Sequence, residues 1–307
     1  MRKGIKMKLV TYEYRNKPSL GLLVGGQIVD LPAGYEVIAG EQLPVAAAME
    51  SLLTWEGGLE LARQLEAEAK GGLASLAGAI LPLEEVRLEA PLLHPNKIIC
   101  IGLNYRDHAA EANLPLPQEP VIFGKYANSI IGPEEDILLP TGLSTKIDFE
   151  AELAVVMGRR ATAVSEEKAL DYVAGYTNFN DISARDLQTR DGQWMKGKCL
   201  DTFAPMGPWL VTADEITNPD RLKIELSLNG EVMQSSNTSN MVFGVAELVS
   251  FLSRLLTLDP GDVIATGTPA GVGFVRRPPI YLTAGDVVEV EIEGLGLLRN
   301  GVREKEQ

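Results

Sequence analysis

Two glutamates that stand two residues apart, Glu150 and Glu152, are the residues of this sequence whose types and spacing most directly suggest chemistry. They lie in KIDFEAELAVV (residues 146–156), where acidic and apolar residues alternate as in a β-strand. Side chains two apart on a strand point to the same face, roughly 6.6 Å apart, so both carboxylates can converge on one cation. Asp148 shares that face. The pattern is also typical of an ordinary half-buried strand with a solvated acidic face.

A third acidic candidate, Asp181, ends the run GYTNFND at residues 175–181. Three carboxylates with no cysteine or second histidine nearby form an oxygen-only donor set, which suits Mg²⁺ or Mn²⁺ rather than Zn²⁺. Asp181 also suits the N-cap of a short helix that begins at Ile182. The two roles do not exclude each other.

A general base is suggested by His108, one of only two histidines, which stands three residues before Glu111. If residues 104–111 are helical, the two side chains face each other, and the carboxylate can hold one ring nitrogen while the other acts as a base. The alternative is a solvated ion pair on a surface helix. The other histidine, His94, precedes Pro95 and is expected in a loop.

Polar and cationic residues follow the third acid closely, at Arg185, Gln188, Lys196 and Lys198. Cationic groups beside a metal site would bind an anionic substrate, and they would counter the repulsion expected from a formal net charge of −14. The glycine-rich run GTPAGVG at residues 267–273 lacks the lysine of a phosphate-binding loop.

Two regions that differ in their predicted secondary structure must position these side chains. The first predicts a small α+β domain with strands at 8–14, 20–24 and 27–31 and helices at 45–53 and 59–70. A turn at Gly25-Gly26 predicts a hairpin between the second and third strands. Pro91 and Pro95 mark the boundary, so we predict domains at residues 1–93 and 94–307.

The second region is rich in short strands, predicted at 97–101, 121–124, 146–156, 172–178 and 222–228, with one convincing helix at 245–256. Asn229-Gly230 predicts a type I′ hairpin turn. The strands follow one another too closely for helical crossovers, which argues against a doubly wound parallel sheet. A β-rich α+β fold of the roll or sandwich kind fits better.

The composition narrows the class of protein. The 28 basic residues against 42 acidic ones, with no basic stripe, argue against a nucleic-acid partner. Two cysteines support neither a disulfide framework nor a zinc site, so a cytoplasmic location is expected. The basic residues 1–7 precede no apolar segment, and no apolar run of membrane-spanning length occurs, so we expect neither a signal peptide nor a membrane span.

Five motifs in order give the sequence a specific resemblance: GLNYRDH (102–108), FEAELAVV (149–156), NDISARD (180–186), GKCLDTF (197–203) and TGTPAGVG (266–273). Together they resemble the fumarylacetoacetate hydrolase family over residues 96–302. The resemblance implies a mixed β-roll catalytic domain, a small N-terminal domain as in bacterial members of this length, and a homodimer. Residues 274–279, with the run RRPP, resemble the arm of the acylpyruvate and sugar-acid branch of the family.

The resemblance also assigns roles by position. It implies that Mg²⁺ or Mn²⁺, with Ca²⁺ as a further candidate, is bound by Glu150, Glu152 and Asp181. It implies that a lid at residues 104–117 carries the water-activating pair His108 and Glu111. It places Lys198 beside the metal, and Arg185, Gln188 and Thr268 against the acid or keto oxygens of the substrate. Cys199-Leu200 departs from the Ser-Phe of many relatives, which leads us to expect a changed pocket shape.

The implied activity is metal-dependent hydrolysis of a carbon–carbon bond in a 2,4-diketo acid such as an acylpyruvate or fumarylpyruvate, a step of aromatic or sugar-acid catabolism. The substrate would be a small anionic keto acid, and His108 would activate the attacking water. Oxaloacetate-type decarboxylation, or isomerisation of an unsaturated dioxo acid, is the alternative on the same site. A non-catalytic metal-binding protein would have lost His108 or Glu111, and both are present.

We predict that Glu152→Ala lowers metal affinity and activity without unfolding the protein, because the metal-site interpretation gives Glu152 a ligand role. Calorimetric titration with Mn²⁺ and a thermal melt test the two parts. Unchanged Mn²⁺ affinity would favour the ordinary strand.

Overall fold

The computed structural model describes residues 7–306, so the prediction that no signal peptide begins the chain falls mostly outside the described residues. The described residues form these strands: β1 (Lys8–Tyr14), β2 (Lys17–Val24), β3 (Gln27–Asp30), β4 (Ile80–Pro82), β5 (Arg87–Leu88), β6 (Ile98–Gly102), β7 (Val121–Lys125), β8 (Ile130–Ile131), β9 (Ile137–Leu139), β10 (Ile147–Asp148), β11 (Ala151–Met157), β12 (Val173–Asn180), β13 (Ser183–Ala184), β14 (Ala204–Thr212), β15 (Lys223–Leu228), β16 (Glu231–Asn237), β17 (Val263–Ala265), β18 (Val287–Ile292) and β19 (Gly296–Glu304). Their α-helices are α1 (Leu31–Ala39), α2 (Met49–Thr54), α3 (Gly58–Gly71), α4 (Arg106–Glu111), α5 (Glu166–Ala169), α6 (Arg185–Gln188), α7 (Met195–Lys198) and α8 (Val245–Leu255).

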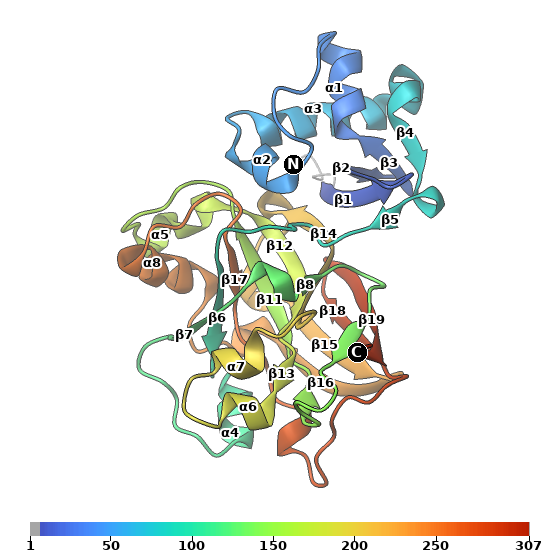
Figure 1. Cartoon of the computed structure of the whole chain (residues 1–307). Coiled ribbons are helices and arrows are strands. Elements are labelled where there is room, and N and C mark those ends of the chain that lie inside the picture. Colours follow the sequence, from blue (N-terminus) through green and yellow to red (C-terminus); the bar gives the residue numbers. More distant parts are fainter. Residues whose placement is uncertain (1–6, 307) are drawn as a thin grey trace.

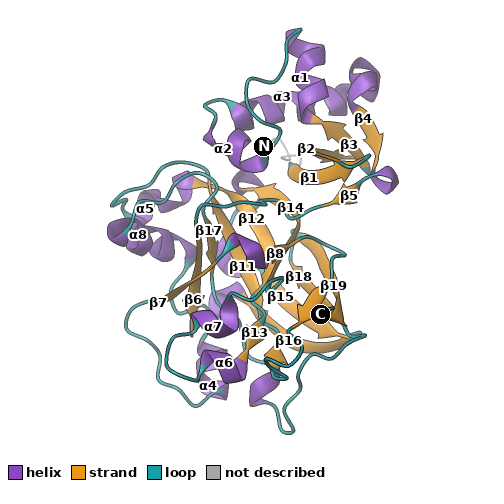
Figure 2. Ribbon diagram, viewed as in Figure 1, coloured by secondary structure: helices purple, strands orange, loops and turns teal. Residues whose placement is uncertain are grey.

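One large mixed sheet runs through the molecule in the order β4-β3-β2-β1-β14-β12-β11-β17-β6-β7 (Figures 1 and 2). Strand β1 pairs antiparallel with β14, so the strands of the N-terminal region continue the sheet of the C-terminal region. Strands β17 and β6 are parallel neighbours beside the central strand β11. This strand pairing joins the two regions into one sheet and does not mark where one domain ends, so the boundary between residues 93 and 94 stays a prediction.

A second sheet, in the order β16-β15-β18-β19-β9, packs against the first. The core between them joins Leu153 and Val155 of β11 to Ile224, Leu226 and Val290 of the second sheet. The fold is therefore a strand-rich α+β structure, as predicted, with helices mainly at its periphery (Figure 2).

The opposite face of β11 is also buried. Ala154 and Val156 belong to a second core that includes Leu61 and Leu65 of α3, and all seven residues of β11 are buried. The half-buried strand with a solvated acidic face is therefore wrong. The single strand predicted over residues 146–156 is also wrong, because the chain breaks between β10 and β11.

Most of the other predicted elements are present. The two hairpins form as predicted, with positive φ at Gly25 and Gly26 and at Asn229 and Gly230. The helix predicted at 45–53 begins later, as α2 at Met49, and helix α1 was not predicted.

Helix α1 does carry a start signal in the sequence. The Asp30 carboxylate accepts a hydrogen bond from the backbone N–H of Ala33 at 2.7 Å, and Pro32 lies in the first turn. Both features are typical of a helix N-terminus. The alternating residues 27–31 predict a strand, and the strand predicted there extends over the start of the helix at Leu31.

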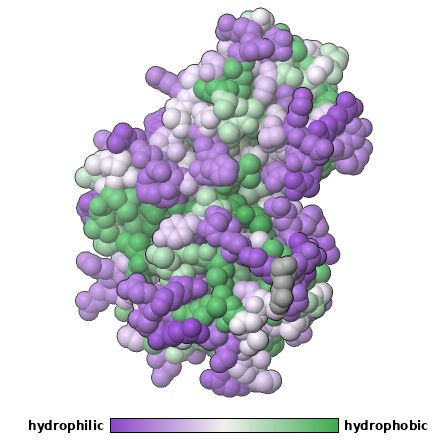
Figure 3. Space-filling model, in the orientation of Figure 1, coloured by the Kyte–Doolittle hydropathy of each residue, from purple (hydrophilic) through white to green (hydrophobic). Residues whose placement is uncertain are grey.

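The face of the molecule in Figure 3 is largely hydrophilic and is interrupted by hydrophobic patches on its C-terminal part. Among residues 7–306, no helix has both the length and the apolar character needed to cross a membrane.

Asn178 of β12 ties the two sheets together. Its amide nitrogen donates to the carbonyl oxygens of Gly207 at 2.9 Å and Gly296 at 3.0 Å. Its oxygen accepts from the Ile292 N–H at 2.9 Å. The side chain is fully buried, so one amide satisfies three backbone groups from β14, β18 and β19.

We predict that Asn178→Ala lowers the free energy of unfolding by about 3 kcal/mol, because it leaves buried backbone groups without partners. Denaturant unfolding measures this loss. Replacing the exposed Gln118 by alanine is the control and is expected to change stability by less than about 0.5 kcal/mol. Equal stability of the two variants would contradict the bridging role.

Candidate active site

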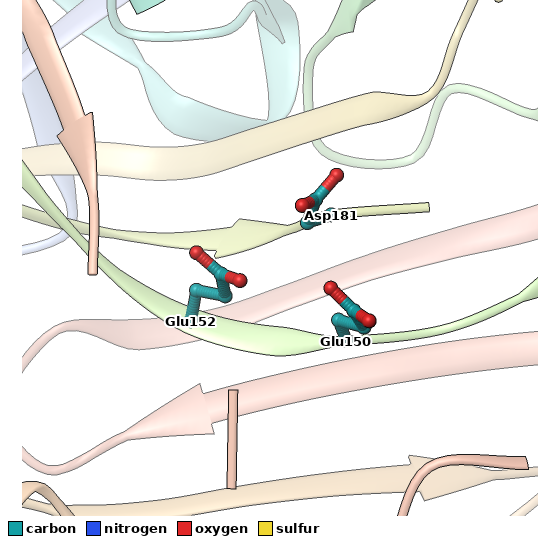
Figure 4. Close-up of side chains that lie close together, drawn as sticks. All are labelled: Glu150, Glu152 and Asp181. Carbon is teal, nitrogen blue, oxygen red and sulfur yellow. The ribbon is translucent and has the colours of Figure 1, made fainter. Parts of the chain in front are cut away.

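Three carboxylates meet where β11 and β12 lie side by side. Glu150 sits in the break before β11, Glu152 lies in β11, and Asp181 directly follows β12. Ligand oxygens of all three lie within 4.8 Å of one another, and Figure 4 shows the side chains close together. All three are buried, so the chain encloses three acidic groups at one point.

The local backbone fixes these positions. Asn180 accepts a hydrogen bond from the Glu150 N–H at 3.0 Å, and the Asp181 N–H donates to the Glu150 carbonyl at 2.9 Å. The Gly267 N–H donates to Glu152 Oε2 at 2.9 Å. No helix begins at Ile182, because Ser183 and Ala184 form β13, so the N-cap interpretation of Asp181 is wrong.

Three cationic side chains surround the acids. Lys198 Nζ lies 2.7 Å from both Glu150 Oε2 and Asp181 Oδ2. Lys125 Nζ lies 2.6 Å from Asp181 Oδ1, and an Arg185 guanidinium nitrogen lies 2.7 Å from Glu150 Oε1. All three cations are buried, so their charges act through a medium of low dielectric constant.

The surroundings shift the pKa values of Glu150 and Glu152 in opposite directions. Burial opposes ionisation of Glu150, but Lys198 and Arg185 outweigh it and hold its pKa at about 2. Burial, together with Asp181 and Glu150, raises the pKa of Glu152 well above its usual range. Lys198 and the Gly267 N–H offset this rise in the pKa of Glu152 only in part.

A hard divalent cation fits this arrangement. Three convergent carboxylates supply oxygen donors of the kind that Mg²⁺ and Mn²⁺ prefer. A bound cation would supply further positive charge beside Glu152. Glu150, Glu152 and Asp181 are thus the residues that would hold it, and Lys198 contacts two of them.

Asp148 has a role that the sequence did not reveal. Its fully buried carboxylate accepts hydrogen bonds from Arg185 Nε at 2.8 Å and from the N–H groups of Gly273 and Phe274 at 2.7 and 3.1 Å. The Phe274 ring in turn packs against the Arg185 guanidinium, 4.3 Å from its centroid. Asp148 thereby fixes Arg185 and the start of the arm at residues 274–279 relative to each other.

His108 and Glu111 lie on α4 as the sequence predicted. His108 Nδ1 is 3.9 Å from Glu111 Oε2, which is an ion-pair distance but too long for a hydrogen bond. Glu111 Oε2 accepts the Gly271 N–H at 2.9 Å. Burial acts to raise the pKa of Glu111, but His108 and the Gly271 N–H together lower it, so Glu111 remains an anion facing the imidazole.

A cavity of about 390 Å³ opens onto this cluster. Its lining includes the predicted site residues His108, Glu150, Glu152, Arg185, Gln188, Lys198 and Thr268. Lys196 instead is exposed and pairs with Asp191. Neither Cys199 nor Leu200 lines this cavity, and both line a second pocket with Leu138 and Asp201, so a changed pocket shape stays a prediction.

Gln234 is another residue that the sequence did not indicate. Its Oε1 accepts the Ala151 N–H at 2.9 Å, and its Nε2 donates to Thr268 Oγ1 at 2.8 Å. It thus joins β11 to the loop after β17. Lys125 was also missed, although a lysine at the end of an apolar strand is the signal that could have indicated it.

A family model, fumarylacetoacetate (FAA) hydrolase C-terminal, matches residues 97–303. The chain belongs to the fumarylacetoacetate hydrolase family. The five sequence motifs fall within the matched region. Two of them are in direct contact, because Asn104 Nδ2 donates to the Thr266 carbonyl at 2.8 Å.

Relatives within the family carry different names. The mitochondrial oxaloacetate tautomerase fahd2 of Xenopus laevis is 45% identical over 305 residues, 97% of this chain and 91% of that protein. The fumarylacetoacetate hydrolase of psychrophilic Exiguobacterium antarcticum has a TM-score of 0.77 and 35% identity, covering 97% of this chain and 100% of that one. A 2-hydroxyhepta-2,4-diene-1,7-dioate isomerase from Mycobacterium marinum has a TM-score of 0.74 and 35% identity, covering 98% and 100%.

We predict that Asp148→Asn lowers the affinity of the protein for a small anion such as oxalate. The Asp148 carboxylate accepts from Arg185 Nε and from two backbone N–H groups, and an amide has only one oxygen with which to accept them, so Arg185 would no longer be held in place. Removing one partner of a buried ion pair also costs about 3 kcal/mol of stability. Calorimetric titration and denaturant unfolding measure the two effects. Asp171→Asn, an exposed acid, is the control, and equal oxalate affinity in both variants would rule out the anchoring role.

Proposed function

We propose that this protein is a divalent-metal-dependent enzyme that interconverts the enol and keto forms of a 2-oxo dicarboxylate, with oxaloacetate as the representative substrate. The observation that carries the proposal is the buried cluster of Glu150, Glu152 and Asp181, paired with three cations and bordering a cavity that His108 also lines. The 45% identity to a protein named oxaloacetate tautomerase supports the same activity.

The charge of the site suits a dianion. Four buried carboxylates, with Asp148 included, and three buried cations give a formal charge of −1. A divalent cation would change this to +1 and would polarise the 2-oxo oxygen as a Lewis acid. Arg185 and Gln188 then offer donors for a carboxylate of the substrate, since Gln188 Oε1 accepts from Arg185 at 3.0 Å and fixes its orientation.

The chemistry requires a proton to move between two atoms of the substrate. In the direction from enol to keto, the His108 imidazole accepts the hydroxyl proton and returns it to C3, so the atoms balance and the protein is unchanged. The Lys198 ammonium, close to the acids, stabilises negative charge on the oxygen during the transfer. Glu111 stabilises the imidazolium that forms in between.

Hydrolysis of a carbon–carbon bond in a 2,4-diketo acid, as in the acylpyruvate branch of the family, is the second candidate. The pair His108 and Glu111 favours it, because an imidazole oriented by a carboxylate can also activate water. Both reactions pass through a stabilised enolate and differ in whether water attacks the distal carbonyl. The homodimer and the cytoplasmic location stay predictions.

We predict that the protein with Mn²⁺ accelerates the decay of enol oxaloacetate, followed by its ultraviolet absorbance, and that His108→Asn lowers kcat/KM by roughly 10²–10⁴-fold. The exposed His94→Asn is the matched control and keeps wild-type activity. Removing the metal with a chelator abolishes the acceleration, and Mn²⁺ restores it.

Product analysis with acylpyruvates separates the two candidates. Formation of pyruvate and a carboxylic acid, without acceleration of oxaloacetate tautomerisation, would favour hydrolysis over our proposal. No His108-dependent acceleration of either reaction would contradict both.

A further inference from the structure

One wall of the cavity is formed by residues that have no role in the proposed proton transfer. Gly102 ends β6, Phe123 lies in β7, and Trp194 immediately precedes α7. Ile101 and Leu103 flank Gly102 and line the same cavity. The wall is therefore apolar, in contrast to the charged side chains of Glu150, Glu152 and Arg185 that also line the cavity.

The three central residues of this wall are in close contact. The Phe123 and Trp194 rings pack edge to face, with centroids 5.3 Å apart and an interplanar angle of 62°. A Cβ atom at Gly102 would lie 2.4 Å from Cζ3 and 2.8 Å from Cη2 of Trp194. Such distances are impossible without movement, so the lack of a side chain at residue 102 is what admits the indole.

Trp194 separates the cavity from solvent. Its side chain lines the cavity yet is partly exposed, and its neighbours Gln193 and Met195 are exposed. Lys198 lies four residues later at the end of α7, whose Gly197 packs tightly against the Ala184 carbonyl. Trp194 and Lys198 therefore stand at opposite ends of this short helix, so the indole and the ammonium group that contacts the acids belong to one packed segment.

We infer that Trp194 is a specificity-determining residue that limits the size of the substrate substituent, and that Gly102 is the position that allows it to do so. This inference rests on the proposed function, since it assumes a 2-oxo acid whose polar end lies at Lys198 and Arg185. Because Trp194, Lys198 and Arg185 line the same cavity, a compact four-carbon diacid held by the cations would leave the indole in place, whereas a bulky substituent would meet the ring.

The test compares turnover of enol oxaloacetate with that of enol phenylpyruvate, whose ring is the bulky substituent. We expect Trp194→Ala to raise the kcat/KM ratio of phenylpyruvate to oxaloacetate by about tenfold or more, which is the scale of discrimination by pocket size. Trp194→Phe should give an intermediate ratio. Met195→Ala, in the same helical turn but outside the cavity lining, should leave the ratio unchanged.

A double-mutant cycle tests the contact itself. Gly102→Ala should change the ratio when Trp194 is present, because the indole must move, and should have little further effect in the Trp194→Ala background. Additive effects of the two substitutions would show that residue 102 does not act through the indole, and they would overturn that part of the inference.

Binding of the two keto acids, measured by calorimetry with Mn²⁺, tests the wall without turnover. If the wild-type protein neither converts nor binds oxaloacetate, the proposed function is wrong. If it converts oxaloacetate, but Trp194→Ala leaves both the turnover ratio and the relative affinities within twofold of wild type, the proposed function stands and this inference is wrong.

Discussion

The burial of three carboxylates at one point is the constraint on which the rest of the structure depends. Acids removed from water and placed within 4.8 Å of one another repel strongly, so they need positive charge close by. The chain supplies it from three separate elements: Lys125 ends β7, Arg185 begins α6 and Lys198 ends α7. The packing of α7 against β7 and against β13, the strand just before α6, thus serves the site as well as the fold.

The position of β11 explains how so many groups can be held accurately. The strand is covered on one face by the second sheet and on the other by the core that includes α3. A side chain on such a strand is fixed by packing from both sides, and this suits a site that must keep its geometry. The break before β11 turns Glu150 out of the regular ladder, where Asn180 holds its backbone.

The sequence predicted those parts of the site whose residues lie close together in the chain, and it missed contacts between residues far apart in the chain. Glu150 and Glu152 stand two apart in one segment, and His108 and Glu111 three apart on one helix, so sequence spacing alone indicated that each pair lies close together. Lys125 contacts an acid 56 residues away, and Asp148 contacts Arg185 37 residues away, so only the folded chain brings them together. The burial of β11 on both faces could not be predicted for the same reason, because the core on its second face includes residues as distant in sequence as Leu9 and Leu20.

The pairing of β1 with β14 has a consequence for how this protein can be divided. A fragment that began near residue 94 would leave the backbone groups of β14 without their neighbour and would uncover the apolar face of β11 and β12. Free strand edges beside an apolar surface are what promotes self-association of truncated proteins. The N-terminal region therefore acts as the cover of the sheet that carries the site, and shortening the chain from this end would sacrifice solubility before it touched the chemistry.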